Sequence, residues 1–251
     1  MSLLADPFTI TFACLAVIIV GLAKGGFSGI GALSAPLLAL ALPPATAAAV
    51  LLPVLLVQDV VSVWAFRKTW NGWIIAWMLP GALLGVVLAS LYSAAVNEAQ
   101  LMLALGLITL GFGLYRLWVE RGGRIVAASN SPGWVGSLFG VGLGVTSQIA
   151  HAGGPAFQIW VTPRRLEHET YVGTSSITFA VVNWMKVPSY LVLGTLNRET
   201  LTAAALLLPL AVLSTLAGVW LIRRLDAARF YTIIYWLMIG LGAKLVWDGM
   251  A

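Results

Sequence analysis

The chain alternates long apolar runs with short polar stretches, as proteins that cross a lipid bilayer several times do. A helix that spans a bilayer needs about 20 predominantly apolar residues. Six runs reach that length without interruption, and each predicts a spanning helix. They cover residues 46–66, 72–92, 98–118, 170–193, 200–222 and 228–247.

Two further apolar regions, 8–42 and 134–161, are interrupted near their middle by glycine and polar residues. Each is too long for one simple span and barely long enough for two. We therefore expect two broken helical hairpins that either cross the membrane or only dip into it, which gives six to ten full crossings. The predicted domains are a first repeat over 1–120, a cytoplasmic linker over 121–133 and a second repeat over 134–251.

The two halves of the chain repeat one another at matching positions. One block recurs at an offset of 119 and a second block at an offset of 129. In the first, Gly25, Ser28, Ile30, Pro36 and Pro44 match Gly144, Ser147, Ile149, Pro155 and Pro163. In the second, Pro80, Asn97, Gly111, Gly113 and Trp118 match Pro209, Asp226, Gly240, Gly242 and Trp247. The pattern predicts an internal duplication, with Asn97 and Asp226 as N-caps of the last helix in each half.

Composition and charge placement support this picture and add an orientation. Hydrophobic residues make up 60% of the chain and charged residues 9%, against about 25% charged in soluble proteins. If each broken hairpin returns to its starting side, ten basic residues share one side and only Arg198 lies on the other. Basic residues favour cytoplasmic loops, so both termini are expected outside the cytoplasm. The halves would then be inverted copies, a common plan among secondary transporters.

The same features exclude several classes of function. The net charge of +5 comes from basic residues that form no single patch, so no nucleic-acid partner is expected. The single cysteine, Cys14, cannot form an internal disulfide or a thiolate metal cluster. The chain lacks the hydrolase, zinc-protease and phosphate-loop motifs, so we expect no enzyme, metal site, cofactor or ATP-driven engine. The first apolar run lacks the basic start of a cleaved signal peptide and is expected to remain in the mature protein.

The two breaks are the best candidates for a binding site. Non-helical backbone at membrane depth survives only inside protein or beside a polar cavity. Glycine allows close approach to a ligand, and a helix restarting near Ala32 or Ala152 would direct free N–H groups toward an anion. The candidate substrate-binding residues are Gly25, Ser28, Gly29, Ser34, Ser147, Gln148, His151, Gly153, Asn183 and Lys186. The alternative is that glycines four residues apart only allow close helix packing.

Ionisable residues within spans are costly and are functional hypotheses by default. Lys24 would contact an anionic substrate or extend to the membrane interface. Lys186 would bind substrate or a counter-ion, and Asp59 would carry a proton, pair with Lys186, or form a purely structural ion pair. His151 is a proton carrier, an anion donor or a structural residue. We assign Lys24 and Asp59 to coupling or charge balance.

The order of these motifs resembles the sulfite exporter TauE/SafE family of membrane permeases. The resemblance depends on the glycine-rich segment that ends in Leu33-Ser34-Ala35-Pro36, on the Pro-Gly-Ala-Leu-Leu-Gly stretch over 80–85, and on the second-half echoes at 140–155 and 173–176. It covers nearly the whole chain. It implies a permease for sulfur-containing anions, often moved outward and coupled to the proton gradient. Ser34 and His151 depart from the usual motifs, and either could shift the substrate.

Together these observations predict an all-α polytopic membrane protein of the bacterial inner membrane, built from two inverted repeats. Each repeat is a broken helical hairpin followed by three transmembrane helices. Its expected function is secondary transport. It would export a small sulfur-containing anion, such as sulfite or a sulfonate, with proton coupling. The expected partners are this anion and the lipid bilayer, and the sequence sets no oligomeric state. The alternatives are a transporter of a cation or amino acid, and a non-transporting membrane subunit or embedded enzyme.

Overall fold

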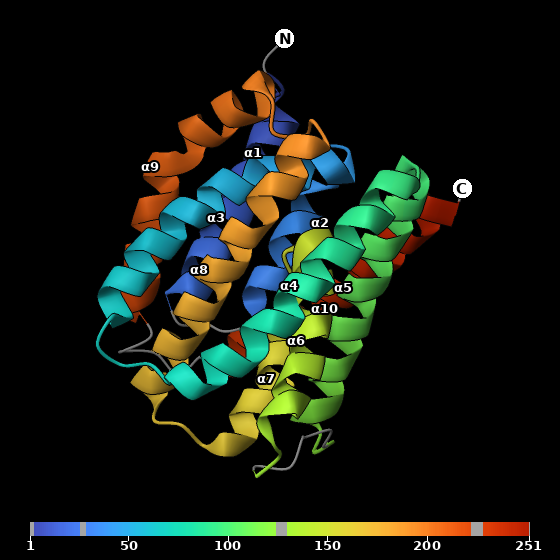
Figure 1. Ribbon diagram of the computed structural model, residues 1–251. Helices are drawn as coiled ribbons and strands as arrows, with labels where there is room; N and C mark the ends of the chain where they lie inside the picture. The colour runs from blue at the N-terminus through green and yellow to red at the C-terminus, as the bar shows by residue number, and fades with distance from the viewer. Residues whose placement is uncertain (1–2, 26–28, 124–129, 222–227, 251) are drawn as a thin grey trace.

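The computed structural model describes residues 3–25, 29–123, 130–221 and 228–250, with the side chains of 228–231 excepted. Within these residues all regular structure is helical (Figure 1). The first half contains α1 (Pro7–Lys24), η1 (Ile30–Leu33), α2 (Ser34–Leu38), α3 (Pro44–Phe66), α4 (Gly72–Ala95) and α5 (Glu98–Glu120). The second contains α6 (Gly133–Ala150), α7 (Gly154–Val161), η2 (Thr162–Arg164), α8 (His168–Val192), α9 (Arg198–Leu221) and α10 (Ala228–Met250).

The long helices follow the predicted apolar runs. Helices α3, α4, α5, α8, α9 and α10 each begin and end within a few residues of a predicted span, and both interrupted regions are broken as expected. Among the described residues, six helices are long and apolar enough to cross a membrane: α1, α3, α4, α5, α9 and the part of α10 over Thr232–Met250. The chain is therefore an all-α polytopic membrane protein. Helix α8 is long enough but less apolar, because it carries Asn183, Lys186 and several buried hydroxyls.

The helices pack in pairs that the two halves share. Helix α1 packs against α9, and its second-half counterpart α6 packs against α4; likewise α3 packs against α9, and α8 against α4. Helices α5 and α10 pack against each other, as do α3 and α8. Exchanging each helix for its counterpart leaves this set of pairs unchanged. The packing agrees with the duplication inferred from the sequence, while the inverted orientation in the membrane and the domain boundaries remain predictions.

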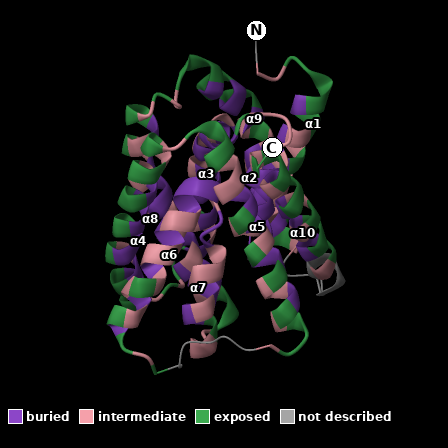
Figure 2. Ribbon diagram, turned by 90° about the vertical axis from the view of Figure 1, so that its right-hand side faces the viewer, coloured by how far each residue is buried: buried purple, intermediate pink, exposed green. Residues whose placement is uncertain are grey.

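Small residues allow these pairs to approach to backbone contact. A Cβ atom added to Gly25 would lie 2.4 Å from the carbonyl carbon of Gly218 in α9. One added to Gly144 would lie 2.2 Å from the carbonyl oxygen of Ala82 in α4. Close packing of this kind is a main source of helix association in membranes. Figure 2 shows the buried positions gathered where the helices meet and the exposed ones facing outward.

Helix ends are defined by local side-chain caps. The Asn97 side chain accepts a hydrogen bond from the Gln100 N–H, and the Gln100 side chain accepts one from the Asn97 N–H, which completes the capping box of α5. The predicted N-cap at Asn97 is thus confirmed, whereas Asp226 lies outside the described residues. Asn71 caps α4 through the Ile74 N–H.

Candidate functional site

The two broken hairpins meet around one cavity near the centre of the bundle. The centre of a water-sized molecule can be placed within about 80 Å³ of this cavity. A single water needs about 10–15 Å³ on this measure, so a small oxyanion or several waters would fit. The polar or glycine residues that line the cavity are Lys24, Gly29, Gly31, Ser147, His151, Gly154, Ser175, Ser176 and Asn183. The two breaks are close neighbours here, since a Cβ on Gly154 would lie 3.9 Å from the Gly29 Cα.

The first break follows Lys24, the last residue of α1. Gly29 adopts a left-handed conformation with φ of 100°, which favours glycine, and η1 begins at the next residue. Gly29 lines the cavity as predicted. Ser28 was also predicted to bind substrate, but it lies outside the described residues.

The second break is centred on His151. This residue is left-handed, with φ of 51°, and its N–H donates to the Ser147 carbonyl at the end of α6. Such a conformation is strained for residues other than glycine and persists where the surroundings hold it in place. Both ring nitrogens of His151 have partners, as described below, and its ring stacks on Tyr190 at a centroid distance of 6.3 Å. Helix α7 then begins at Gly154, two residues from the predicted restart.

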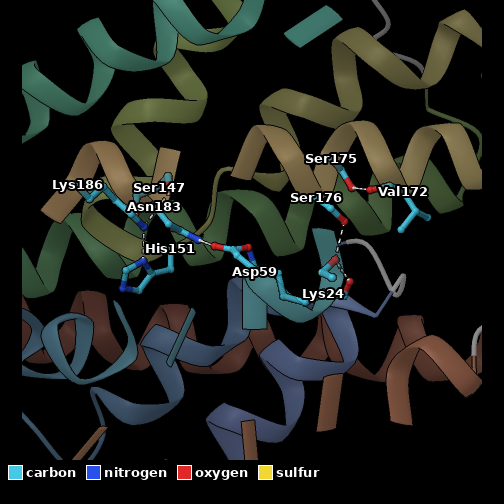
Figure 3. A network of polar contacts seen from close by, with 10 residues as sticks. Lys24, Asp59, Ser147, His151, Val172, Ser175, Ser176, Asn183 and Lys186 are labelled. Atoms are coloured by element: carbon cyan, nitrogen blue, oxygen red, sulfur yellow. Dashed lines mark hydrogen bonds and ion pairs between the residues drawn. The ribbon is translucent and has the colours of Figure 1, made fainter. Parts of the chain in front are cut away.

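Lys186 of α8 and His151 form one cluster beside the cavity (Figure 3). The Lys186 Nζ lies 2.7 Å from His151 Nδ1, and 3.2 Å and 3.3 Å from the carbonyl and hydroxyl oxygens of Ser147. The other ring nitrogen, Nε2, lies 3.0 Å from the Ala48 carbonyl oxygen in α3. A carbonyl oxygen only accepts, so Nε2 carries a hydrogen. With Lys186 protonated, Nδ1 must accept, and the imidazole is then neutral.

Asp59 of α3 organises a second cluster next to the first. One carboxylate oxygen is ion-paired with Lys24, and the other accepts a hydrogen bond of 2.6 Å from the Asn183 amide. The Lys24 ammonium also lies 5.5 Å from the centroid of the Phe179 ring. Asn183 and Lys186 are three residues apart and share one face of α8. Asn183 lines the cavity, and Lys186 lies behind the lining residues Ser147 and His151.

The two clusters leave a positive charge without a counter-ion. Lys24 and Asp59 compensate each other, with side-chain exposures of 11% and 3%. Lys186 is fully buried, and among the described residues no carboxylate lies within ion-pair distance of it. The predicted pairing of Asp59 with Lys186 is therefore wrong, because Asp59 is already held by Lys24 and Asn183.

Three other predicted residues lie away from this cavity. Gly25 packs against Gly218, and Gly153 packs against Leu143 and Phe179. The Ser34 hydroxyl donates to the Gly31 carbonyl at 2.7 Å. The position of Gly25 supports the packing alternative that the glycine spacing left open.

Gln148 lies on the far side of the second break. Its amide donates to the Ser189 hydroxyl at 2.9 Å, and it lines a second, smaller cavity together with Ala48, Tyr190 and Thr195. His151 lines the central cavity and contacts Ala48 and Tyr190 of the second. The His151 ring therefore lies between the two cavities.

Sequence reasoning missed the serines of the cavity wall. Ser175 and Ser176 line the cavity on α8, and the Ser176 hydroxyl lies 2.6 Å from that of Ser62 in α3. Ser62 in turn donates to the Lys24 carbonyl at 2.8 Å. The signal was present as polar positions at helical spacing along 172–186, which predict a polar face within this span.

The described residues of this site lie within a part of the chain that matches the model of a known family. The model of the family described as sulfite exporter TauE/SafE matches residues 13–245, which include both breaks and every described residue of the cavity wall. No curated protein and no solved structure matches the chain. The family is one of membrane transporters, and the helical architecture agrees with that role. The chain belongs to the sulfite exporter TauE/SafE family.

Proposed function

We propose that this protein is a secondary transporter that exports a small sulfur-containing anion, such as sulfite or a small sulfonate, with proton coupling. The observation that carries the proposal is the buried ammonium of Lys186, beside a cavity and without a carboxylate partner among the described residues. An isolated charge inside a membrane protein is expensive. A bound oxyanion would supply the missing negative charge.

The cavity wall suits an oxyanion in chemistry as well as in charge. Ser147, Ser175 and Ser176 offer hydroxyl groups. Hydrogen bonds from hydroxyl and ammonium donors to an ionised oxygen are about twice as strong as neutral ones. The cavity has several times the space that one water needs, so a small anion would fit. Lys24 would add a second cation at the wall, tempered by its ion pair with Asp59.

The second break is the point at which transport would be controlled. An anion moving from the central cavity to the smaller one must pass His151, which is bonded to Ala48 and stacked on Tyr190. Separation of these three groups would join the two cavities. Non-helical backbone at depth is the usual place of the substrate site in transporters with broken helices.

A cation or amino acid is a weaker match to this wall. Both would need an available carboxylate, as acceptor for a cation or for an amino group. None of the described residues that line the cavity carries a carboxylate, and Lys24 and Asn183 occupy both oxygens of the neighbouring Asp59. The charge balance of the described wall therefore favours an anion.

The test is a flux panel in proteoliposomes. Purified protein is reconstituted, and movement of sulfite, methanesulfonate, thiosulfate and sulfate is compared with that of sodium and alanine, under a pH gradient and under a membrane potential. We expect saturable flux of at least one sulfur-containing anion and none of sodium or alanine. Flux no faster than in protein-free liposomes for all four anions would refute the proposal.

A further inference from the structure

We propose that Lys186 and His151 together are the proton-binding site of this transporter, and that binding of an anion brings one additional proton onto the pair. The inference depends on the proposed function, because it assigns coupling to the same cavity. It also moves the coupling role away from Lys24 and Asp59, for which the sequence suggested it.

The first step is a count of hydrogens in the empty site. His151 Nε2 faces the carbonyl oxygen of Ala48 and carries a hydrogen in either charge state. Only 2.7 Å separates Nδ1 from the Lys186 ammonium, which leaves room for one hydrogen between the two nitrogens. In this geometry a protonated Nδ1 would direct its N–H at the N–H groups of Lys186. The empty pair therefore holds at most one positive charge.

The described groups around the pair do not allow it to hold a second positive charge. From α6, Ser147 offers its carbonyl and hydroxyl oxygens to Lys186. From α8, the Tyr190 hydroxyl donates to the Gln148 carbonyl, and the Asn183 amide donates to Asp59. Lys24 of α1 is a like charge, and Asp59 of α3 is committed to it. None of these described groups places a negative charge against His151.

A bound anion changes the number of hydrogens that the Lys186–His151 pair can hold. An oxyanion placed between Lys186 and His151 presents acceptor oxygens to both nitrogens and increases their separation. His151 Nδ1 then gains a hydrogen and donates it to one anion oxygen, while Lys186 donates to another. The additional proton comes from the compartment to which the cavity is open, and it leaves when the anion leaves. Anion and proton thus bind together, because each makes the other's binding more favourable. The two move in the same direction, so export would be driven by the outward gradient of the anion and not by the inward gradient of protons.

The ion pair of Lys24 and Asp59 has a different role in this scheme. Its two charges cancel, and Asn183 fixes the second carboxylate oxygen. It keeps the wall at a constant charge while the Lys186–His151 pair changes by one. This arrangement assigns the two clusters of Figure 3 to charge balance and to proton binding respectively.

The test measures protons taken up per bound anion. Methanesulfonate and thiosulfate are suitable probes, because their own charge is constant between about pH 5 and about pH 8, where histidine titrates. Purified protein in lipid nanodiscs is titrated by calorimetry in two buffers of different ionisation enthalpy. Near the upper pH we expect uptake approaching one proton per anion, and less near the lower pH.

Two variants locate the site, and a third is the matched control. His151→Asn keeps a residue that tolerates the left-handed backbone but cannot titrate, and it should bind anion with no proton uptake. Lys186→Met should abolish both binding and uptake. Lys244→Met removes an exposed lysine of α10, with side-chain exposure of 58%, and should behave as the wild type.

The possible results distinguish failure of the proton-binding site from failure of anion transport. Anion binding and flux without proton uptake in the wild-type protein would overturn the inference and leave anion transport intact. Uptake that persists in His151→Asn would also overturn it. Absence of anion flux in the wild type would refute the proposed function itself. Because the wild-type measurement is decisive alone, the test does not depend on the variants folding.

Discussion

The ammonium of Lys186 in α8 lies 2.7 Å from Nδ1 of His151, the residue at which the second broken hairpin leaves its first helix. Through this contact the most buried lysine or arginine of the described chain is next to the second break, where the backbone would have to move during transport. A change in the charge of the pair would therefore alter the forces on the break itself.

Replacing Lys186 should weaken anion binding without harming the fold. Lys186→Met removes a fully buried charge that has no carboxylate partner among the described residues. We expect anion affinity to fall at least about tenfold, which corresponds to about 1.4 kcal/mol. Unfolding should occur at an equal or higher temperature, since uncompensated buried charge is destabilising. A folded variant with unchanged affinity in calorimetry would remove Lys186 from the site.

Breaking the ion pair of Lys24 and Asp59 should lower the stability of the protein, because the remaining residue becomes an unpaired buried charge. Removing one member of a buried pair typically costs about 3–5 kcal/mol, whereas replacing both is often nearly neutral. Asp59→Leu should therefore destabilise more than the double variant Lys24→Met, Asp59→Leu. Thermal unfolding of the two single variants and the double variant measures the coupling. Additive effects would show that the two side chains do not interact.

Neighbouring residues at the end of α6 should differ in their effect on binding. The Ser147 hydroxyl lines the central cavity, while Gln148 bonds to Ser189 on the far side of the break. Ser147→Ala should weaken equilibrium anion binding by about 1 kcal/mol, the usual net value of one hydrogen bond. Gln148→Met should leave it unchanged. The reverse result in the same calorimetric titration would place the anion in the smaller cavity.

Glycine substitutions should separate packing from binding. Gly25→Ala would place a Cβ 2.4 Å from the backbone of Gly218, so the paired helices α1 and α9 must move apart. We expect a clear loss of thermal stability. Gly240→Ala, in the interior of α10 with nothing within 4 Å, should be neutral or stabilising by up to about 1 kcal/mol. Equal melting temperatures for both variants would contradict the packing role of Gly25.

Much of the fold could be predicted because a bilayer tolerates few alternatives. A run such as 46–66 must be a spanning helix, since its backbone groups must be satisfied within the segment; the observed α3 is Pro44–Phe66. The position of both breaks followed from glycine and polar residues within apolar runs. The face of α8 was predictable from helical periodicity, but it was overlooked because the run looked like a simple span.

The partners of the charged residues could not be predicted in the same way. From the sequence, Lys186 was the named candidate partner of Asp59, whereas the structure pairs Asp59 with Lys24. The choice depends on how closely α1, α3 and α8 approach each other. Glycine spacing was ambiguous for a similar reason: Gly25 and Gly29 share one motif, yet one contacts α9 and the other lines the cavity. Ser147 and Gln148 are adjacent in sequence but point to opposite sides, because successive residues of a helix differ by about 100°.

In the proposed function, the cavity beside Lys186 binds a sulfur-containing anion, which the protein then moves across the membrane. The most direct measurement is exchange of radiolabelled sulfite in proteoliposomes that contain wild-type protein, Lys186→Met or Lys244→Met. We expect saturable exchange in the wild type and in Lys244→Met, and loss of that exchange in Lys186→Met. Exchange at the same rate in all three preparations, or at the rate of protein-free liposomes in the wild type, would contradict the proposed function.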